Sequence, residues 1–206
     1  MAEYIYEIKN NLHPDVCKRI IEKFEQDENK APGKVVANPR TNEYAINPDI
    51  KVSMDLAINP NCKEWMDIDR HLFERLADGK DKYLNYMKKM WDEASNFVID
   101  DKISKGFVSF NYDSGYQIQR ISKGGHYIYH NDYAPHQKRT IAYIWYLNTL
   151  NQEDGGTTDF LTQNVKIKPE EGKLIFFPAT WTYIHKGSEV ITDSTKYIIT
   201  GFLIYD

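Results

Sequence analysis

The sequence predicts an α+β protein in which helices precede an all-β core. Apolar residues recur at helical spacing in the first half, and short β-branched and aromatic runs separated by Gly, Asn, Asp and Pro fill the second half. No linker or repeat separates the halves. We therefore expect one domain over residues 1–206, with an α-rich region at 1–100 and a β core at 101–206.

The composition is that of a folded protein. The 206 residues are 41% hydrophobic and 27% charged, so a substantial core is available. The net charge of −4, without a run of Lys or Arg, argues against general nucleic-acid binding. No stretch approaches the ~20 apolar residues of a membrane span, and no signal-peptide pattern is present. We expect a soluble, cytoplasmic protein without nucleic-acid or membrane partners, in which Cys17 and Cys62 are free thiols.

The α-rich region begins with a strand and a helix. Residues 3–10 alternate between apolar and polar and predict a short strand. Residues 13–28 predict a helix, because Pro14 suits a first helical turn and the apolar residues share one face. Residues 50–58 predict a second strand.

Two further segments complete this region. Residues 30–48 are rich in turn residues and predict a mobile loop, which is either a substrate lid or an ordinary surface loop. Residues 61–99 have helical periodicity, and the sequence ADGK at 77–80 predicts a break within the helix.

Short runs typical of strands follow one another through the β core. Eight are expected, at residues 106–122, 126–132, 139–148, 156–162, 164–172, 173–179, 182–187 and 196–206. Strands at such spacing are typical of a sandwich, barrel or jelly roll.

A cluster of histidines suggests a metal site. His126, His130 and His136 lie close together with one carboxylate, Asp132. Three imidazoles would suit zinc, but His136 follows a turn that leaves its direction unconstrained. The alternative uses His130 and Asp132, because residues i and i+2 of an extended segment point to the same side.

His185 is the candidate third ligand in that alternative, and it follows a strongly apolar run. Two His and one carboxylate on one face of an octahedron leave three positions open, which suits Fe(II) oxygenases. Zinc on the same residues would favour a hydrolase or an isomerase.

Several motifs follow one another in a specific order. They are RISKGGHYIYHND at 120–132, RTIAYIWYLN at 139–148, Gly155–Gly156, GKLIFFP at 172–178, His185, and TKYIITGF at 195–202. Together they resemble the 2-oxoglutarate and Fe(II)-dependent dioxygenases, in particular the prolyl 4-hydroxylase-like branch, whose pattern is R-Y-x-x-G-Q-x-Y-x-x-H-x-D. Ile121 replaces the usual Tyr, and Gly125 replaces the usual Gln.

The resemblance implies a double-stranded β-helix of the jelly-roll or cupin type, with N-terminal helices packed against the major sheet. It implies Fe(II) held by His130, Asp132 and His185. It also implies 2-oxoglutarate as co-substrate, O2 as oxidant and ascorbate as an optional reductant.

Two residues are expected to bind the 5-carboxylate of 2-oxoglutarate. Lys196 supplies the charge, and the hydroxyl of Tyr146 is a second donor. The basic residue of the family lies nine or ten positions after the distal His, whereas Lys196 lies eleven positions after it. Lys186 follows His185 directly and would point away from the metal on a strand.

The resemblance further implies hydroxylation of a proline-containing peptide or protein, with release of succinate and CO2. A small-molecule or free amino-acid hydroxylase, a nucleobase demethylase and a non-catalytic binding protein are the alternatives. Four residues are expected to border the cavity and bind substrate: Tyr127, Arg139, Trp181 and Phe202.

Overall fold

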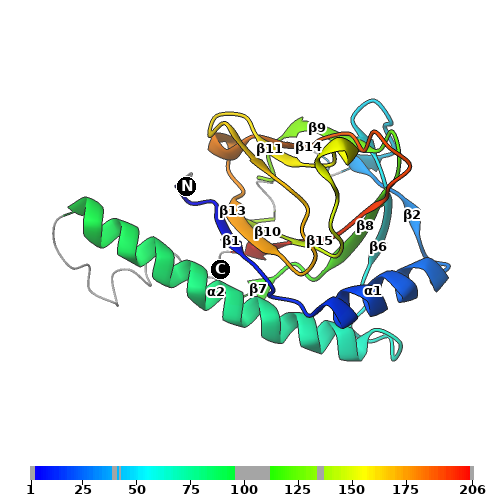
Figure 1. The fold of residues 1–206 in the computed structure, drawn as a ribbon, viewed down its shortest axis with the longest axis horizontal. Helices are drawn as coiled ribbons and strands as arrows, with labels where there is room; N and C mark the ends of the chain where they lie inside the picture. Colours follow the sequence, from blue (N-terminus) through cyan, green and yellow to red (C-terminus); the bar gives the residue numbers. More distant parts are fainter. Residues whose placement is uncertain (1–2, 39–40, 42, 96–111, 134–136, 205–206) are drawn as a thin grey trace.

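The computed structural model describes residues 3–38, 41, 43–95, 112–133 and 137–204. This part of the chain contains two large antiparallel sheets, a small two-stranded sheet and two α-helices. The helices pack against the outer face of the larger sheet, and the smaller of the two large sheets lies on the opposite side (Figure 1). The predicted α+β double-stranded β-helix, with its N-terminal helices on the major sheet, is confirmed.

Within the described residues, the larger sheet has eight strands in the order β1-β13-β10-β15-β8-β6-β2, and β7 pairs with β15. Their bounds are β1 Tyr6–Ile8, β2 Ala31–Pro32, β6 Met54–Ala57, β7 Tyr112–Asp113, β8 Gln117–Ile121, β10 Arg139–Tyr146, β13 Leu174–Pro178 and β15 Lys196–Ile204. The other large sheet, with the order β12-β11-β14-β9-β5, has five described strands. Their bounds are β5 Lys51–Val52, β9 His126–His130, β11 Thr158–Phe160, β12 Val165–Ile167 and β14 His185–Gly187.

The eight runs predicted as strands in the β core all contain strands, β7 to β15. Residues 106–111 of the first run lie outside the described residues. The central strands of the larger sheet are buried on both faces, so a run such as LIFFP is continuously apolar, and short apolar runs between turn residues were the signal for strands.

Residues 50–58, predicted as one strand, contribute to both large sheets. β5 pairs with β9 in the five-stranded sheet, and β6 pairs with β8 in the eight-stranded sheet. The chain therefore crosses between the sheets at Ser53. The crossing brings Lys51 and Asp55 together, and the Nζ of Lys51 donates to Oδ2 of Asp55 at 2.7 Å.

The expectation of a loop at residues 30–48 is wrong in part. This stretch contains β2 and the paired strands β3 (Val35–Asn38) and β4 (Glu43–Ala45). Turn residues dominate its composition, but pairing with neighbouring strands overrides that local preference.

The first helix, α1, spans Pro14–Gln26. The Nδ1 of His13 accepts from the backbone N–H of Asp15 at the N-cap, and Pro14 occupies the first turn, where its missing N–H costs nothing. Cys17, Ile20 and Phe24 form its buried face. The helix therefore begins and packs as predicted.

The second helix, α2, spans Met66–Ser95 without interruption, so the predicted break at residues 77–80 is wrong. A Cβ on Gly79 would lie 2.6 Å from Cδ2 of Leu174 and 3.1 Å from Cε2 of Phe176. The glycine thus allows the helix to approach β13 closely. Packing against the sheet outweighs the roughly 1 kcal/mol by which a helical glycine is disfavoured relative to alanine.

Two apolar clusters lie on the two faces of the larger sheet. On β10, Tyr143 and Trp145 belong to the cluster shared with the helices, whereas Ile144 and Tyr146 belong to the other cluster. The period of two along the strand therefore divides the molecule into a helix-side core and a core between the sheets.

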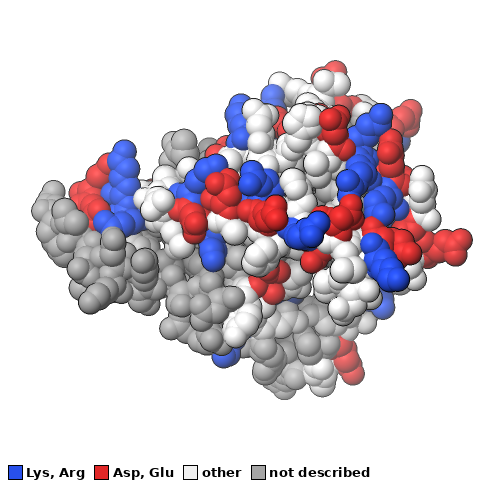
Figure 2. Space-filling model, turned by 90° about the horizontal axis from the view of Figure 1, so that it is seen from below, with Lys and Arg blue, Asp and Glu red and all other residues white. Residues whose placement is uncertain are grey.

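The face of the protein that lies at the bottom of Figure 1 carries both positive and negative side chains. Figure 2 shows Lys and Arg interspersed with Asp and Glu over that face, without a continuous basic strip. Among the described residues, no helix is long and apolar enough to cross a membrane. Cys17 is a buried free thiol and Cys62 a half-buried one, as predicted.

Candidate metal centre and active-site cavity

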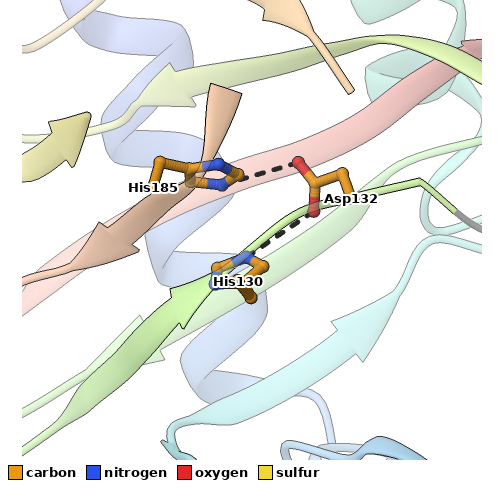
Figure 3. A group of neighbouring side chains, drawn as sticks. All are labelled: His130, Asp132 and His185. Atoms are coloured by element: carbon orange, nitrogen blue, oxygen red, sulfur yellow. Dashed lines mark ion pairs between the residues drawn. The ribbon is translucent and has the colours of Figure 1, made fainter. Parts of the chain in front are cut away.

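Three side chains predicted as ligands converge between strands β9 and β14. These strands are neighbours, and His130 pairs directly with His185 although 55 positions separate them in the sequence. Asp132 follows the end of β9, and its carboxylate lies between the imidazoles (Figure 3). Its Oδ1 lies 3.6 Å from Nε2 of His130, and its Oδ2 lies 3.5 Å from Nε2 of His185.

The imidazoles are oriented by the main chain. The Nδ1 of His130 lies 2.8 Å from the carbonyl oxygen of Ile128, and the Nδ1 of His185 lies 3.1 Å from that of Tyr183. A carbonyl only accepts, so each Nδ1 carries the hydrogen when the ring is neutral. Each Nε2 then presents its lone pair to the space that it shares with Asp132.

The electrostatics suit a cation in this space. Burial lowers the pKa of His185 to about 4, against the opposing effect of Asp132, so this imidazole is neutral at pH 7. Burial alone would raise the pKa of Asp132, but His185, His130 and Arg139 together hold it below its usual value. The site therefore offers a neutral imidazole nitrogen from His185 and a carboxylate from Asp132.

All ligand atoms of these three residues lie within 4.8 Å of one another. A set of two imidazoles and one carboxylate is the facial triad that binds Fe(II) and leaves coordination positions open. The residues present therefore fit Fe(II). His126 does not join this group, because its Nδ1 lies 3.0 Å from the carbonyl oxygen of Gly124. His136 lies outside the described residues.

A cavity of about 480 Å³ extends from this centre and is lined by residues of both large sheets. Alternate side chains of β15 line the cavity from one end to the other. Lys196, Ile198, Thr200 and Phe202 line the cavity, whereas Ile199 and Leu203 face the helix-side core. Strand β15 thus forms one wall of the cavity, from Lys196 to Phe202.

Lys196 is a buried cation at one end of this wall. Its side chain is only 3% exposed, and its Nζ forms no hydrogen bond or ion pair with any described residue. Burial lowers its pKa to about 8, against the attraction of Asp159, so it remains mostly charged at pH 7. A buried ammonium that faces a cavity without an anionic partner is suited to bind a carboxylate.

The hydroxyl of Tyr146, predicted as a direct donor to the co-substrate, points elsewhere. It donates to Oγ1 of Thr158 at 2.7 Å, and the Tyr146 ring centroid lies 5.8 Å from Nζ of Lys196. Thr158, and not Tyr146, lines the cavity. Thr158 was not among the residues predicted from the sequence, although its place in the run GTTDFLT is compatible with a side chain that faces the cavity.

Three of the four predicted substrate residues line the cavity. Tyr127 stacks on His130 with ring centroids 3.6 Å apart, and burial raises its pKa to about 12. Arg139 lies over the ring of Phe202 at 3.8 Å and donates to the carbonyl of Asp132 at 3.4 Å. Trp181, by contrast, is 73% exposed and does not line the cavity, although it was expected at the cavity border.

A polar part of the cavity wall was not predicted from the sequence. It consists of Lys51, Ser53, Asp55, Gln117, Gln119 and Thr200, which come from β5, β6, β8, β15 and the crossing between the sheets. Polar residues at alternate positions of an otherwise apolar strand, as in YQIQRI, were the available signal.

The comparisons with known proteins agree with this arrangement. Residues 116–204 match the family described as the 2OG-Fe(II) oxygenase superfamily. No curated protein matches the chain.

Solved structures with the same fold were found. A viral collagen prolyl hydroxylase from Paramecium bursaria Chlorella virus-1 is 20% identical with a TM-score of 0.65, covering 97% of this chain and 95% of that chain. A Pseudomonas putida prolyl-4-hydroxylase is 15% identical with a TM-score of 0.65, covering 98% and 93%. A Trichoplax adhaerens prolyl hydroxylase, in complex with a peptide fragment of the hypoxia inducible factor oxygen degradation domain, is 17% identical with a TM-score of 0.71, covering 98% and 83%.

At these identities the solved structures establish the shared fold, while the family match spans the strands that carry the metal ligands and Lys196. The five residues of the predicted iron and 2-oxoglutarate sites thus lie inside the matched region, on the fold that the resemblance implied. Residues 116–204, which include the predicted metal ligands and Lys196, are therefore similar to the 2OG-Fe(II) oxygenase superfamily.

Proposed function

We propose that this protein is an Fe(II)- and 2-oxoglutarate-dependent dioxygenase that hydroxylates a prolyl residue in a peptide or protein. The observation that carries the proposal is one cavity that contains both the His130–Asp132–His185 centre and the buried cation Lys196. The structural similarity to prolyl hydroxylases, one of them bound to a peptide fragment, supports a proline-containing peptide as the substrate.

We assign Fe(II) to Nε2 of His130, Nε2 of His185 and the carboxylate of Asp132. We assign the 5-carboxylate of 2-oxoglutarate to Lys196 and the hydroxyl of Thr158. When bound, Fe(II) and 2-oxoglutarate supply the oxidising chemistry, in which one oxygen atom of O2 enters a C–H bond and the other enters succinate, with release of CO2. The role of ascorbate as a reductant stays a prediction.

The surrounding side chains hold these groups in place. Tyr146 donates to Thr158 and so orients its hydroxyl beside Lys196. Tyr127 stacks on His130 and fixes the plane of that imidazole. Arg139 and Phe202 face the cavity at the opposite end from Lys196, where a substrate side chain would enter. Apolar side chains, including Ile121, Ile144 and Ile198, limit the access of water.

We also propose a reducing, cytoplasmic setting. The free thiols of Cys17 and Cys62 support it, because disulfides are rare in that compartment.

The test is succinate formation from 2-oxoglutarate by the purified protein, with Fe(II) added and an acetylated, amidated peptide containing proline supplied. We expect stoichiometric succinate and a mass increase of about 16 in the peptide, which is the mass of the one oxygen atom inserted in this chemistry. Asp132→Ala should abolish both, because two imidazoles alone hold the metal weakly.

Glu153→Ala, on the exposed 3₁₀ turn Gln152–Asp154, is the matched control for loss of a carboxylate and should retain activity. Zinc-dependent hydrolysis of the peptide, or succinate formation that survives Asp132→Ala, would contradict the proposal. Modification of free L-proline but not of the peptide would reassign the substrate to a small molecule.

A further inference from the structure

The cavity wall between Lys196 and Phe202 carries amide side chains that the proposed function leaves unassigned. Gln119 pairs with Ile198, and Gln117 pairs with Thr200, across strands β8 and β15. Both glutamines and Thr200 line the cavity, and we call these three residues the amide wall. It lies between the Lys196 end and the end formed by Phe202 and Arg139.

The amide wall is internally hydrogen-bonded. Nε2 of Gln119 donates to Oε1 of Gln117 at 2.8 Å and to Oγ1 of Thr200 at 3.3 Å. Both N–H groups of Gln119 are then used. The carbonyl of Gln119 and the amino group of Gln117 have no hydrogen-bond partner among the described residues. If both amides were turned around, one acceptor and one donor would still remain.

The same wall has no unpaired charge. Asp55 pairs with Gln119 across β6 and β8 and is the adjacent ionisable group. It accepts from Lys51 Nζ at 2.7 Å and from Ser53 Oγ at 2.7 Å, and the side chains of Lys51 and Asp55 are only 6% and 9% exposed. A charged substrate group would therefore find no free counter-ion here.

We propose that the amide wall binds a main-chain peptide group of the substrate. A secondary amide has one N–H donor and one C=O acceptor, which complement the free carbonyl of Gln119 and the free N–H of Gln117. The peptide group that precedes a proline has no N–H, so the bound group is the one on the C-terminal side of the hydroxylated residue. This inference rests on the proposed function and makes Gln117 and Gln119 specificity-determining residues for peptides over free amino acids.

The test measures binding under conditions without turnover, with Mn(II) and 2-oxoglutarate present and oxygen excluded. The probes are acetyl-Ala-Pro-Ala-Ala-amide and its ester analogue, in which oxygen replaces the N–H that follows proline. Titration calorimetry gives both dissociation constants. We expect the ester to bind the wild-type protein about 5-fold more weakly, the equivalent of one neutral hydrogen bond.

Gln119→Leu should weaken binding of the amide probe about 5-fold and abolish the difference between amide and ester, since the acceptor is gone. Gln117→Met, which removes the free donor, is a second variant and should weaken both probes about equally. Gln152→Leu, on an exposed 3₁₀ turn, is the control and should bind like the wild-type protein. Thermal melting establishes that each variant folds.

Equal binding of amide and ester to the wild-type protein would overturn the inference, as would a Gln119→Leu protein that still discriminates between them. Tighter binding of free L-proline than of the peptide would overturn it as well. Succinate formation by the wild-type protein distinguishes a failure of this inference from a failure of the proposed function. If succinate forms without amide discrimination, only the inference fails, and if no succinate forms, the proposed function fails with it.

Discussion

At the scale of single residues, the burial of Lys196 determines what its side chain can bind. A lysine at 3% exposure costs folding free energy unless an anion offsets it. Asp159 exerts some attraction, but it already accepts from Thr157 and Ser188. The positive charge of Lys196 is therefore available to a carboxylate in the cavity.

Lys196→Met should raise the KM for 2-oxoglutarate by about 10- to 100-fold, since a charge-assisted hydrogen bond contributes about 1.5–3 kcal/mol. Steady-state kinetics at saturating peptide measure this change. Lys123→Met removes an exposed, ion-paired lysine of the surface and should leave the KM unchanged. An unchanged KM in Lys196→Met would show that another group binds the 5-carboxylate.

The same residue predicts a pH dependence. Burial lowers the pKa of Lys196 to about 8, so its charge is present below that pH and is lost as the pH rises through it. The value of kcat/KM for 2-oxoglutarate reports the free enzyme, and we expect it to fall above pH 8. The kcat should change less, because the bound carboxylate holds the proton on Lys196. A pH-rate profile from pH 7 to 9.5 tests this, and Lys196→Met should lack the decline.

At the scale of elements, the order of strands and helices followed from local pattern, but their boundaries and partners did not. The β core could be predicted because short β-branched and aromatic runs alternate with turn residues along the chain. The segment at 50–58 looked like one strand because its alternation continues across Ser53, although β5 and β6 belong to different sheets. Likewise, ADGK looked like a helix break, and only β13 explains why glycine is accommodated there.

Helix α2 supplies a prediction at this scale. Gly79→Ala adds a Cβ that would lie 2.6 Å from Leu174, so the helix must move away from β13. We expect the free energy of unfolding to fall by about 1–3 kcal/mol, although alanine has the better helix propensity. Urea denaturation measures it. Asn85→Ala, at an exposed position of the same helix, should be neutral or slightly stabilising. Stabilisation by Gly79→Ala would contradict the packing argument.

At the scale of the whole molecule, the candidate metal site joins parts of the chain that are distant in sequence. His130 lies on β9 and His185 on β14, whereas Lys196 lies on the opposite large sheet. A metal bound by the triad therefore stabilises the paired strands of the smaller sheet. A ligand that binds only the folded state raises stability by mass action.

Mn(II), which does not oxidise readily, should raise the melting temperature. At a free concentration 100 times its dissociation constant, the gain is about 2.7 kcal/mol, which corresponds to about 5–10 °C for a chain of this size. Differential scanning fluorimetry without oxygen measures it, independently of activity. Asp132→Ala should lose most of the shift, whereas Glu153→Ala should keep it. Equal shifts in both variants would place the metal elsewhere.

The sequence by itself determined the class of the fold and predicted His130 and Asp132 as metal ligands. Both depend on local pattern: short β-rich runs between turn residues, and a His and an Asp two positions apart. The tertiary structure alone decided that His185 faces His130, that the hydroxyl of Tyr146 donates to Thr158, and that Trp181 lies on the surface. It also decided that Gln117, Gln119 and Asp55 share a cavity wall. These are contacts between strands far apart in the chain, and sheet register, which no local pattern encodes, brings them together.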